Sequence, residues 1–484
     1  MTIPFNWKCR KFQPAFIAVV LFCLAHNTIA QRVVSADEVR QAGLRVVEIT
    51  TVDGEEPRGE TVSHPDDPTN QNVVAANKPA CRIVITLAGD TLYDSLPYQR
   101  DSTGATIRIA GNTSAYFSNP QNMPYKLKLE RKADLLCRGE AYRDRHWRLM
   151  KDTKTLRTIL ALKLSEILGL EWTPAYHPCN VVINGDYRGC YLLMESVRRN
   201  PRCRIRCDKA TGYIVERDPY WWKEDSCFSS DWYDGSSRFR WTWKYPEEQE
   251  VTIGRRDSIQ RHICAAEQSI ADGNYDHYFD LTSLAKWLIL HDLLATRDAD
   301  GTNFYLKKTD DSDTTLLQMP CVWDFDSSFE LPEGSFSTLH TIDNTYFSAM
   351  LASGNQAFAR TYATVWHACK DTLLNQLTAF LTDYPSTAEA QVLNRSRKLN
   401  DQRWGWYHPT VAQDAQKLLK RMRSHIALLD DQIPFPDDAV TTVRSATERP
   451  APPQQLFTIA GTAVSREQAR KGLYILQGRV ILLP

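Results

Sequence analysis

The sequence lacks a net charge, because its 484 residues include 58 Lys and Arg and 58 Asp and Glu side chains. A neutral chain has no overall field that attracts DNA, RNA or anionic lipid, so we expect no nucleic-acid partner. No apolar run after the N-terminus approaches the ~20 residues of a membrane-spanning helix, so we expect no transmembrane segment. Hydrophobic residues make up 43% of the chain, which excludes a disordered or collagen-like protein.

The signature motifs of several enzyme classes are also missing. The sequence has no Walker A motif, which disfavours a P-loop nucleotide-binding enzyme. It has no Cys-x-x-Cys pair, so a zinc site is not expected. It has no His-Glu-x-x-His motif, which disfavours a metalloprotease of that type.

The first thirty residues have the layout of a secretory signal peptide. Lys8, Arg10 and Lys11 are positively charged, an apolar stretch follows over residues 16–25, and Ala30 ends a short run that suits a cleavage site. A buried N-terminal helix is the alternative. We expect the protein to be secreted or located at the cell surface.

The sequence contains twelve cysteines, of which ten follow the predicted signal peptide. Export permits disulfide bonds. Cys179 and Cys190 flank Asn184-Gly185, which favours a two-residue hairpin turn, and such a turn places the two cysteines opposite each other. The cysteines therefore have two alternative states, disulfide bonds or free buried thiols.

The hydrophobic pattern indicates an α+β protein with a mixed sheet in its N-terminal part and helices in its C-terminal part. Residues 156–168 carry apolar side chains at helical spacing, and Gly169 suits the end of that helix. A second helix is expected over residues 281–295, with Asp280 as its N-cap. Residues 346–433 are also helical in pattern. Strands are expected over residues 83–87, 106–109, 125–129 and 213–216, and hairpins over 181–194 and 304–322.

A group of acidic and amide side chains follows the second predicted helix. Asp298 and Asn303 lie five positions apart, and Asp324 follows the predicted hairpin of residues 304–322. The open ends of a hairpin are neighbours, so we expect these three side chains to meet. Their oxygens suit Mg²⁺ or Mn²⁺, and a carboxylate can accept the proton of an attacking hydroxyl in phosphoryl transfer. The alternative is structural: Asp298 and Asp300 cap the helix end, and Asp324 ends a strand.

The spacing of Asp298, Asn303 and Asp324, together with several other segments, resembles the CotH-type family of atypical spore-coat kinases. The resemblance covers roughly residues 40–433. The resemblance implies a divergent protein-kinase-like fold that binds ATP with Mg²⁺ or Mn²⁺. It also implies phosphate transfer to Ser or Thr of an exported protein. The matching segments occur in the family's order: Arg108–Ser114, Tyr125–Lys128, Trp147–Leu149, Val182–Glu195, Gly212–Asp218, Lys244–Glu247, Asp298 with Asn303, Trp323–Asp326 and Asn400–Trp404.

The resemblance and the composition together divide the chain into five parts. These are a signal peptide (1–30), an N-terminal strand and loop region (31–80), a CotH-like kinase domain (81–433), a Pro- and Thr-rich linker (434–455) and a small β-like tail (456–484). The tail resembles the C-terminal sorting tails of proteins exported by the type IX route. A simple terminal hairpin is the alternative.

The resemblance implies roles for the acidic group and for one lysine. Asp298 matches the catalytic carboxylate, while Asn303 and Asp324 match the metal ligands. Asp326 is a competing metal ligand. Lys126 matches the lysine that contacts the phosphates of ATP.

Other residues are expected around the same phosphates. Lys128 points to the same face of its strand as Lys126 and competes for the same role. Glu195 and Glu216 are each candidates to pair with Lys126, and exposed carboxylates at strand ends are the alternative. The family's loop near the nucleotide phosphates is matched by Arg108 and by a turn that contains Gly111, Asn112 and Ser114.

Two further stretches have two interpretations each. A basic loop either docks an acidic substrate or is a solvated loop held by cysteines; its arginines are Arg198, Arg199, Arg202, Arg204 and Arg206. The Trp and Tyr residues between positions 220 and 245 either stack on a sugar or, as we favour, pack in the core.

The sequence therefore predicts a secreted, ATP- and metal-dependent Ser/Thr protein kinase. One alternative is a catalytically inactive kinase-like module that binds at a surface. Another is a phosphotransferase that acts on a sugar or another small molecule.

Overall fold

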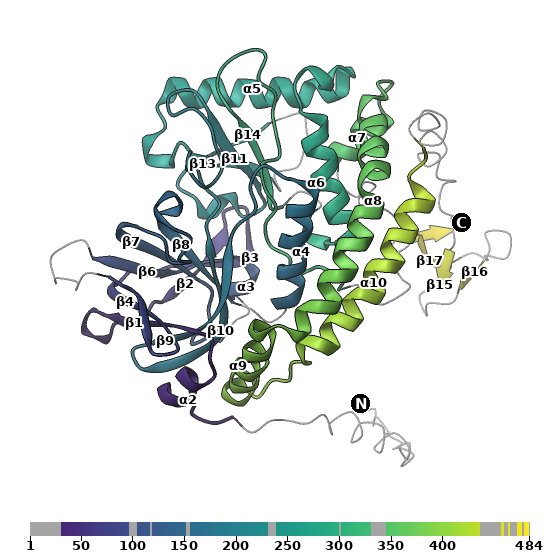
Figure 1. The fold of residues 1–484 in the computed structure, drawn as a ribbon. Coiled ribbons are helices and arrows are strands. Elements are labelled where there is room, and N and C mark those ends of the chain that lie inside the picture. Colours follow the sequence, from purple (N-terminus) through teal and green to yellow (C-terminus); the bar gives the residue numbers. More distant parts are fainter. Residues whose placement is uncertain are drawn as a thin grey trace, which may run out of the picture.

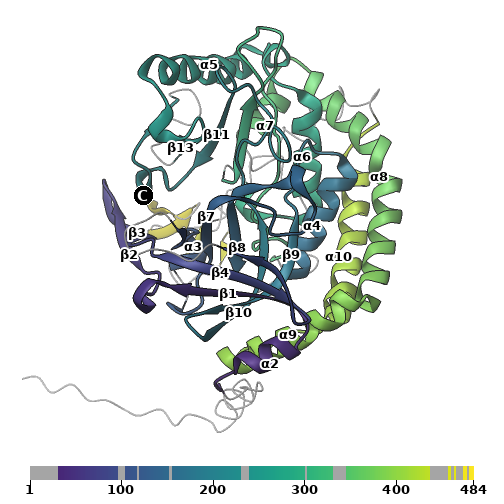
Figure 2. The ribbon, with the colours of Figure 1, turned by 60° about the vertical axis from the view of Figure 1, so that its left-hand side comes forward.

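The structure is a computed structural model, and it describes residues 31–95, 104–116, 119–151, 155–230, 239–299, 302–330 and 345–435, with four short strands between residues 456 and 483. The predicted signal peptide and nearly all of the predicted linker lie outside these residues. The two larger sheets lie on one side of a group of long helices (Figures 1 and 2). This arrangement confirms the α+β class.

The N-terminal half forms a sheet that closes on itself, because β1 pairs with β9 on one side and with β4 on the other. Alternate side chains point inward. In β7, Tyr125, Leu127 and Leu129 are buried in the interior, so Lys126 and Lys128 lie on the outer face. In sheet order the strands are β1 (Arg45–Thr51), β9 (Tyr176–Ile183), β10 (Asp186–Glu195), β8 (Asp144–Lys151), β7 (Tyr125–Ala133), β6 (Ala105–Ile109), β4 (Ala80–Leu87) and β5 (Asp90–Asp94).

The helices pack around α6, which is buried along nearly its whole length and contacts α4, α8 and α10. Asp280 caps α6 as expected, accepting hydrogen bonds from the amides of Thr282 and Ser283. Within the described residues, no helix has the length and apolar character needed to cross a membrane. The helices are α2 (Ala36–Gln41), α3 (Thr113–Tyr116), α4 (Thr155–Leu168), α5 (Ile253–Asp272), α6 (Leu281–Leu294), α7 (Thr345–Ala352), α8 (Ala357–Asp383), α9 (Ala388–Trp404) and α10 (Val411–Gln432).

A second sheet lies beside the closed sheet (Figure 1). In order it contains β12 (Cys227–Phe228), β13 (Arg240–Tyr245), β11 (Tyr213–Asp218) and β14 (Phe304–Lys308).

The predicted hairpin over residues 304–322 forms only in part. β14 confirms its first strand, but β14 pairs with β11. The return strand is reduced to one bridge, in which Lys307 and Gln318 exchange backbone hydrogen bonds of 2.9 Å. The bridge shows that the segment after residue 318 runs antiparallel to β14, so Asn303 and Asp324 follow from the same end of this pairing.

The hairpin of β9 and β10 contains an extra residue that changes its register. Asn184 and Gly185 form the predicted two-residue turn, with φ angles of 51° and 82°. The register then shifts between Tyr187 and Gly189, which leaves Arg188 as a β-bulge.

The bulge separates Cys179 from Cys190. Cys190 lies opposite Asn180, so Cys179 faces the interior of the closed sheet and Cys190 faces outward. The expectation that these cysteines lie opposite each other is therefore wrong. None of the ten cysteines in the described residues forms a disulfide bond, which agrees with the second of the two alternatives.

Helix α9 holds this bulge in place. The indole Nε1 of Trp404 donates to the carbonyl oxygen of Arg188 at 3.2 Å. Asn400 Oδ1 accepts a hydrogen bond from the amide of Cys190, also at 3.2 Å. A Cβ atom at Gly189 would lie 2.4 Å from Asn400 Oδ1, so only glycine fits there. The family-like segment at residues 400–404 is thus a structural clamp on the hairpin.

The remaining elements lie outside the closed sheet and the helix group. β2 (Gly59–His64) and β3 (Asp67–Ala75) form a two-stranded hairpin. In the predicted tail, the strands are β15 (Leu456–Thr458), β16 (Ala463–Val464), β17 (Gly472–Leu476) and β18 (Arg479–Leu483). Short 3-10 turns occur at Val52–Gly54, Glu140–Tyr142, Trp221–Lys223 (η3), Glu248–Glu250, Tyr275–His277, Arg297–Ala299 (η6) and Tyr384–Ser386.

Candidate active site

Three cationic side chains form a row on the outer face of the closed sheet. Arg108 on β6 pairs in register with Lys126 on β7, and Lys126 pairs with Arg148 on β8. Registered neighbours on adjacent strands point to the same face. The pKa of Lys126 is well below its usual value, mainly because of the positive charge of Arg148 and then because of burial and Arg108. Three basic side chains in one row have the chemistry that recognises phosphate groups.

Arg148 connects the cation row with the acidic group. Burial lowers its pKa to about 10, while the neighbouring Tyr305, Glu216 and Asp324 act in the opposite direction. Its guanidinium lies 6.0 Å from the ring centre of Trp323, the residue before Asp324. The sequence interpretation did not single out Arg148. In the sequence, Arg148 stands out only as a charged residue between the apolar Trp147 and Leu149. That it lies beside Lys126 depends on the register of β7 and β8, which the sequence does not contain.

Glu216 pairs with a lysine other than the expected one. Lys244 Nζ on β13 lies 2.5 Å from the Glu216 carboxylate on β11. Burial disfavours the charged form of Lys244 and lowers its pKa. The negative charges of Glu216, Glu224 and Asp218 outweigh this effect, so the pKa of Lys244 is raised. The predicted pair of Glu216 with Lys126 is therefore wrong, and so is the alternative of an exposed carboxylate.

Glu195 lies on the other side of the sheet from Lys126. It is paired in register with Trp147, which faces the interior of the closed sheet. Its fully buried carboxylate binds Arg138 at 2.5 Å and lies 3.6 Å from Arg204. The predicted pair of Glu195 with Lys126 is wrong, because neighbouring residues of a strand point to opposite faces and Met194, not Glu195, shares the face of Arg148.

The loop after β6 is tied to the second sheet. Lys223 of η3 donates to the carbonyl oxygen of Gly111 at 3.2 Å and to Asn112 Oδ1 at 2.8 Å. Gly111 has a φ angle of 96°, which favours glycine. The predicted phosphate loop thus lies between the closed sheet and η3, next to Arg108. The side chain of Ser114 lies outside the described residues.

The carboxylates of Asp298 and Asp326 both lie within electrostatic reach of Asp324. Asp298 lies in η6, just after α6, and its amide donates to Ser327 Oγ at 3.3 Å. The pKa of Asp324 is raised to about 8, first because the surrounding protein shields it from water and then because of the charges of Asp326 and Asp298. Asp326 is exposed at the edge of this group. Asp300 lies outside the described residues.

Two members of the group have unusual backbone conformations. Asn303 has a φ angle of 54° and Asp324 one of 61°. Asn and Asp tolerate this left-handed region better than other residues with a side chain, but it still costs energy. Such conformations cluster at functional sites.

The acidic group suits a divalent cation that is also held by phosphate oxygens. Among the described residues, no three His, Cys, Asp or Glu side chains form a metal-binding group. Mg²⁺ in nucleotide sites needs fewer, because one or two protein oxygens, waters and substrate phosphates complete its shell. A shielded carboxylate beside two like charges, as at Asp324, is a donor that a cation would stabilise.

The basic loop is not held by cysteines as one interpretation expected, while docking of an acidic substrate on its exposed Arg202 and Arg206 stays a prediction. Arg204 is fully buried and lies 3.6 Å from both Asp144 and Glu195, with its guanidinium 5.2 Å from the ring centre of Trp147. The loop is therefore anchored by an internal ion-pair network, and its cysteines are free.

The tryptophans that dominate the described part of the aromatic stretch pack in the core, as favoured, while Trp232 and Tyr233 lie outside the described residues. Trp221, Trp241 and Trp243 are all buried.

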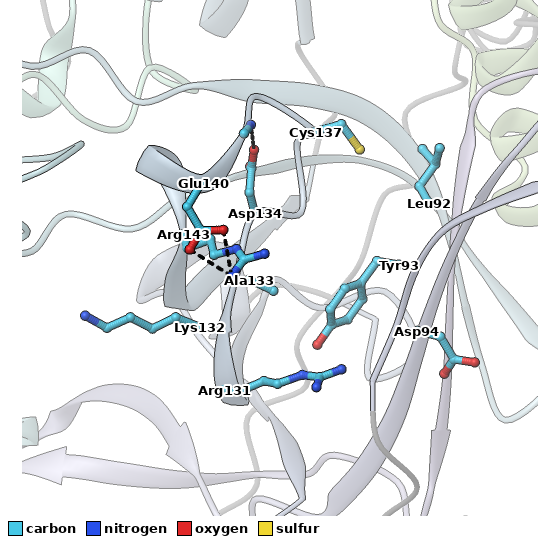
Figure 3. A pocket seen from close by; sticks show the side chains of 11 residues that line it. Leu92, Tyr93, Asp94, Arg131, Lys132, Ala133, Asp134, Cys137, Glu140 and Arg143 are labelled. Atoms are coloured by element: carbon cyan, nitrogen blue, oxygen red, sulfur yellow. Dashed lines mark hydrogen bonds and ion pairs between the residues drawn. The ribbon is translucent and has the colours of Figure 1, made fainter.

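A cavity of about 630 Å³ lies away from these residues, at the far end of β7. Figure 3 shows Tyr93 and Arg131 on its wall. On the wall of this cavity, Arg143 Nη1 and Glu140 Oε2 form an ion pair of 2.8 Å. None of the residues predicted for the site lines this cavity, so it is separate from the candidate active site.

A model of the family described as "CotH kinase protein" matches residues 107–428. The match covers most of the chain and includes the cation row, the Glu216–Lys244 pair and the acidic group. Among curated proteins, none matches the chain.

Proposed function

Because the chain belongs to the CotH kinase family, we propose that it is an ATP- and metal-dependent protein kinase that phosphorylates Ser or Thr residues of exported proteins. One observation carries the proposal: Arg148 lies within electrostatic reach of the cations Lys126 and Arg108 and of the carboxylate of Asp324. A cation row next to an acidic group is what a bound nucleotide with its metal requires.

The cation row binds the phosphates of ATP. Lys126 and Arg148 contact them from the strands, and Arg108 does so from the edge near Gly111. The exposed Lys128 is farther along the same face and serves the outer end of the nucleotide. Glu195 has no part in ATP binding, because it lies on the other face.

Asn303 and Asp324 hold Mg²⁺ or Mn²⁺, with the exposed Asp326 as a weaker contributor. When bound, the cation supplies positive charge that offsets the charge of the phosphates. Asp324 is the main ligand in this proposal, because its shielding from water makes a counter-charge most favourable there.

Asp298 acts as the proton acceptor. The hydroxyl oxygen of the substrate attacks the γ-phosphorus of ATP, and the bond from this phosphorus to the β–γ bridging oxygen breaks. ADP leaves, and the hydroxyl proton passes to the Asp298 carboxylate. The exposure of Asp298 supports this role, because the acceptor hydroxyl of a protein has to reach it.

Export is part of the proposal. The signal-peptide pattern of residues 1–30 supports secretion or a surface location, and residues 456–484 serve as a sorting tail. Protein substrates are then encountered outside the cytoplasm.

The test is transfer of radiolabelled phosphate from ATP to a generic protein substrate, with Mn²⁺ or Mg²⁺ and the chain lacking residues 1–30. We expect label on Ser or Thr, and a loss of at least about a hundredfold in Asp324→Ala and Asp298→Asn. Asp311→Ala removes an exposed carboxylate at the turn that follows β14, at the other end of this strand from Asn303, and is the matched control. No transfer, or equal transfer by wild type and Asp324→Ala, contradicts the proposal. Label on a sugar instead of the protein assigns a different acceptor.

A further inference from the structure

A second cavity, of about 270 Å³, lies next to the acidic group. It is bordered by Arg157 at the start of α4, by Phe329, by the loop of residues 407–409 and by Lys417 and Arg421 of α10. Phe329 is three positions after Asp326. Asp326 also lies within electrostatic reach of Arg157 on the cavity wall, which places the cavity beside the acidic group of the proposed kinase.

The charges around this cavity are mostly positive. Arg157, Lys417 and Arg421 line it, and Asp414 is the lining carboxylate. Asp414 is engaged by Arg397, whose Nη1 lies 3.0 Å from Asp414 Oδ2. Three cations therefore line the cavity, and the charge of its carboxylate, Asp414, is offset by a fourth cation, Arg397.

Two of these cations hold the segment that follows the acidic group. Arg157 donates to the carbonyl oxygen of Ser328, and Arg421 donates to that of Phe329. The pKa of Arg157 is lowered by burial and then by the charge of Arg421, while Glu330, Asp414 and Asp326 act in the opposite direction. The two guanidinium groups are therefore close, and an anion between them and Lys417 relieves their repulsion.

The size of the cavity limits its occupant. At about 270 Å³ it is smaller than the roughly 300–1,000 Å³ typical of sites for whole small molecules. One side chain fits. Tyr407, which is 67% exposed, stands at its rim and offers a surface for the neighbouring peptide backbone.

We propose that this cavity binds an acidic or phosphorylated side chain of the protein substrate, close to the Ser or Thr that receives the phosphate. The inference rests on the proposed function and adds a substrate class to it. Carboxylate and phosphate groups share the chemistry that arginine and lysine recognise. The kinase therefore prefers acceptor sites within acidic or already phosphorylated segments.

The test uses fluorescein-labelled peptides with a central Ser, flanked by Ala, Asp, phosphoserine or Lys, and the chain lacking residues 1–30. Fluorescence polarisation gives their affinities without any need for catalysis. We expect the Asp or phosphoserine peptide to bind about tenfold or more tightly than the Ala peptide. Comparison of these two peptides identifies which anion is preferred.

Lys417→Glu is the informative variant, because Lys417 lines the cavity but holds no backbone carbonyl of residues 328–329. We expect it to remove the preference for the anionic peptides and to favour the Lys peptide. Arg423→Glu makes the same charge change at an exposed position of α10 outside the cavity, and it should keep the wild-type preference.

Equal binding of the Asp, phosphoserine and Ala peptides by the wild type overturns the inference. An equal loss in Lys417→Glu and Arg423→Glu also overturns it, because it indicates a general charge effect. A preserved preference without phosphate transfer to any peptide supports the cavity's role but refutes the proposed kinase. The two proposals therefore fail in distinguishable ways.

Discussion

Lys126 on β7 and Arg148 on β8 lie side by side in register, two positive charges on one face of the closed sheet. The acid that a lysine in this position would be expected to bind, Glu216, instead pairs with Lys244 across the second sheet. Glu224 lies within electrostatic reach of Lys126 and Arg108, so this wall carries three basic side chains and one carboxylate, with the acidic group near Arg148. Such a polarised arrangement favours a ligand that carries both phosphate and metal.

Replacement of Arg148 by Gln should weaken nucleotide binding about tenfold, because a charge-assisted contact to phosphate is lost. Titration with a fluorescent ATP analogue and Mg²⁺ measures the dissociation constant. Arg145→Gln removes an exposed arginine of the same strand and serves as the control. Equal affinity of wild type and Arg148→Gln rules out a phosphate contact at this residue.

Replacement of Glu216 by Gln should lower the free energy of unfolding by about 2 kcal/mol, because it leaves the charge of Lys244 without its closest partner. Urea denaturation measures the change. The double variant with Lys244→Met should cost less than the sum of the two single variants, since no uncompensated charge remains. Strict additivity would show that the 2.5 Å pair contributes nothing.

Replacement of Gly189 by Ala should destabilise the protein by about 3 kcal/mol or more, because the new Cβ meets Asn400 and the φ angle of 124° suits only glycine. Gly54→Ala is the matched control. Gly54 also has a positive φ angle, of 70°, but a Cβ atom there would meet nothing within 4 Å beyond its chain neighbours. We expect a loss of only about 1 kcal/mol there. Equal losses, measured by thermal or urea unfolding, would contradict a clamp by α9.

The contribution of Lys223 to stability should depend on pH. Burial lowers the pKa of Lys223 to about 8 in the folded protein, whereas an unfolded lysine has a pKa of about 10.4. Between these values the unfolded chain binds more protons at this residue, so folding becomes more favourable as the pH rises. The free energy of unfolding of the wild type, relative to Lys223→Met, should therefore increase from pH 8 to pH 10.

Urea unfolding at several pH values measures this difference, and the exposed position of Lys209→Met provides a control for loss of a lysine. A difference between wild type and Lys223→Met that stays constant from pH 7 to pH 10 contradicts the shifted pKa. It would also weaken the case that Lys223 is held tightly against Gly111 and Asn112.

The sequence was informative where short-range rules act. The alternation of Tyr125–Leu129 predicts β7 and places Lys126 on the outer face, the Asn184-Gly185 pair predicts a tight turn, and Asp280 predicts the start of α6. Each of these features depends on residues within one turn or strand, so the local pattern is sufficient.

Features that depend on several elements at once could not be predicted in this way. The bulge at Arg188 moves Cys190 away from Cys179, and it is stabilised by Trp404, more than two hundred positions away. The partner of Glu216 depends on which strand lies beside β11. A local pattern contains neither the register between strands nor the contacts of a distant helix.

In the proposed enzyme, Asn303 and Asp324 hold a metal ion whose nucleotide lies against Lys126 and Arg148. A crystal structure of the chain with Mn²⁺ and a non-hydrolysable ATP analogue, with the manganese located by its anomalous signal, tests this arrangement most directly. We expect manganese within about 2.5 Å of oxygens of both residues and phosphates in contact with Lys126 and Arg148. Manganese bound elsewhere, or phosphates away from this row of cations, would contradict it.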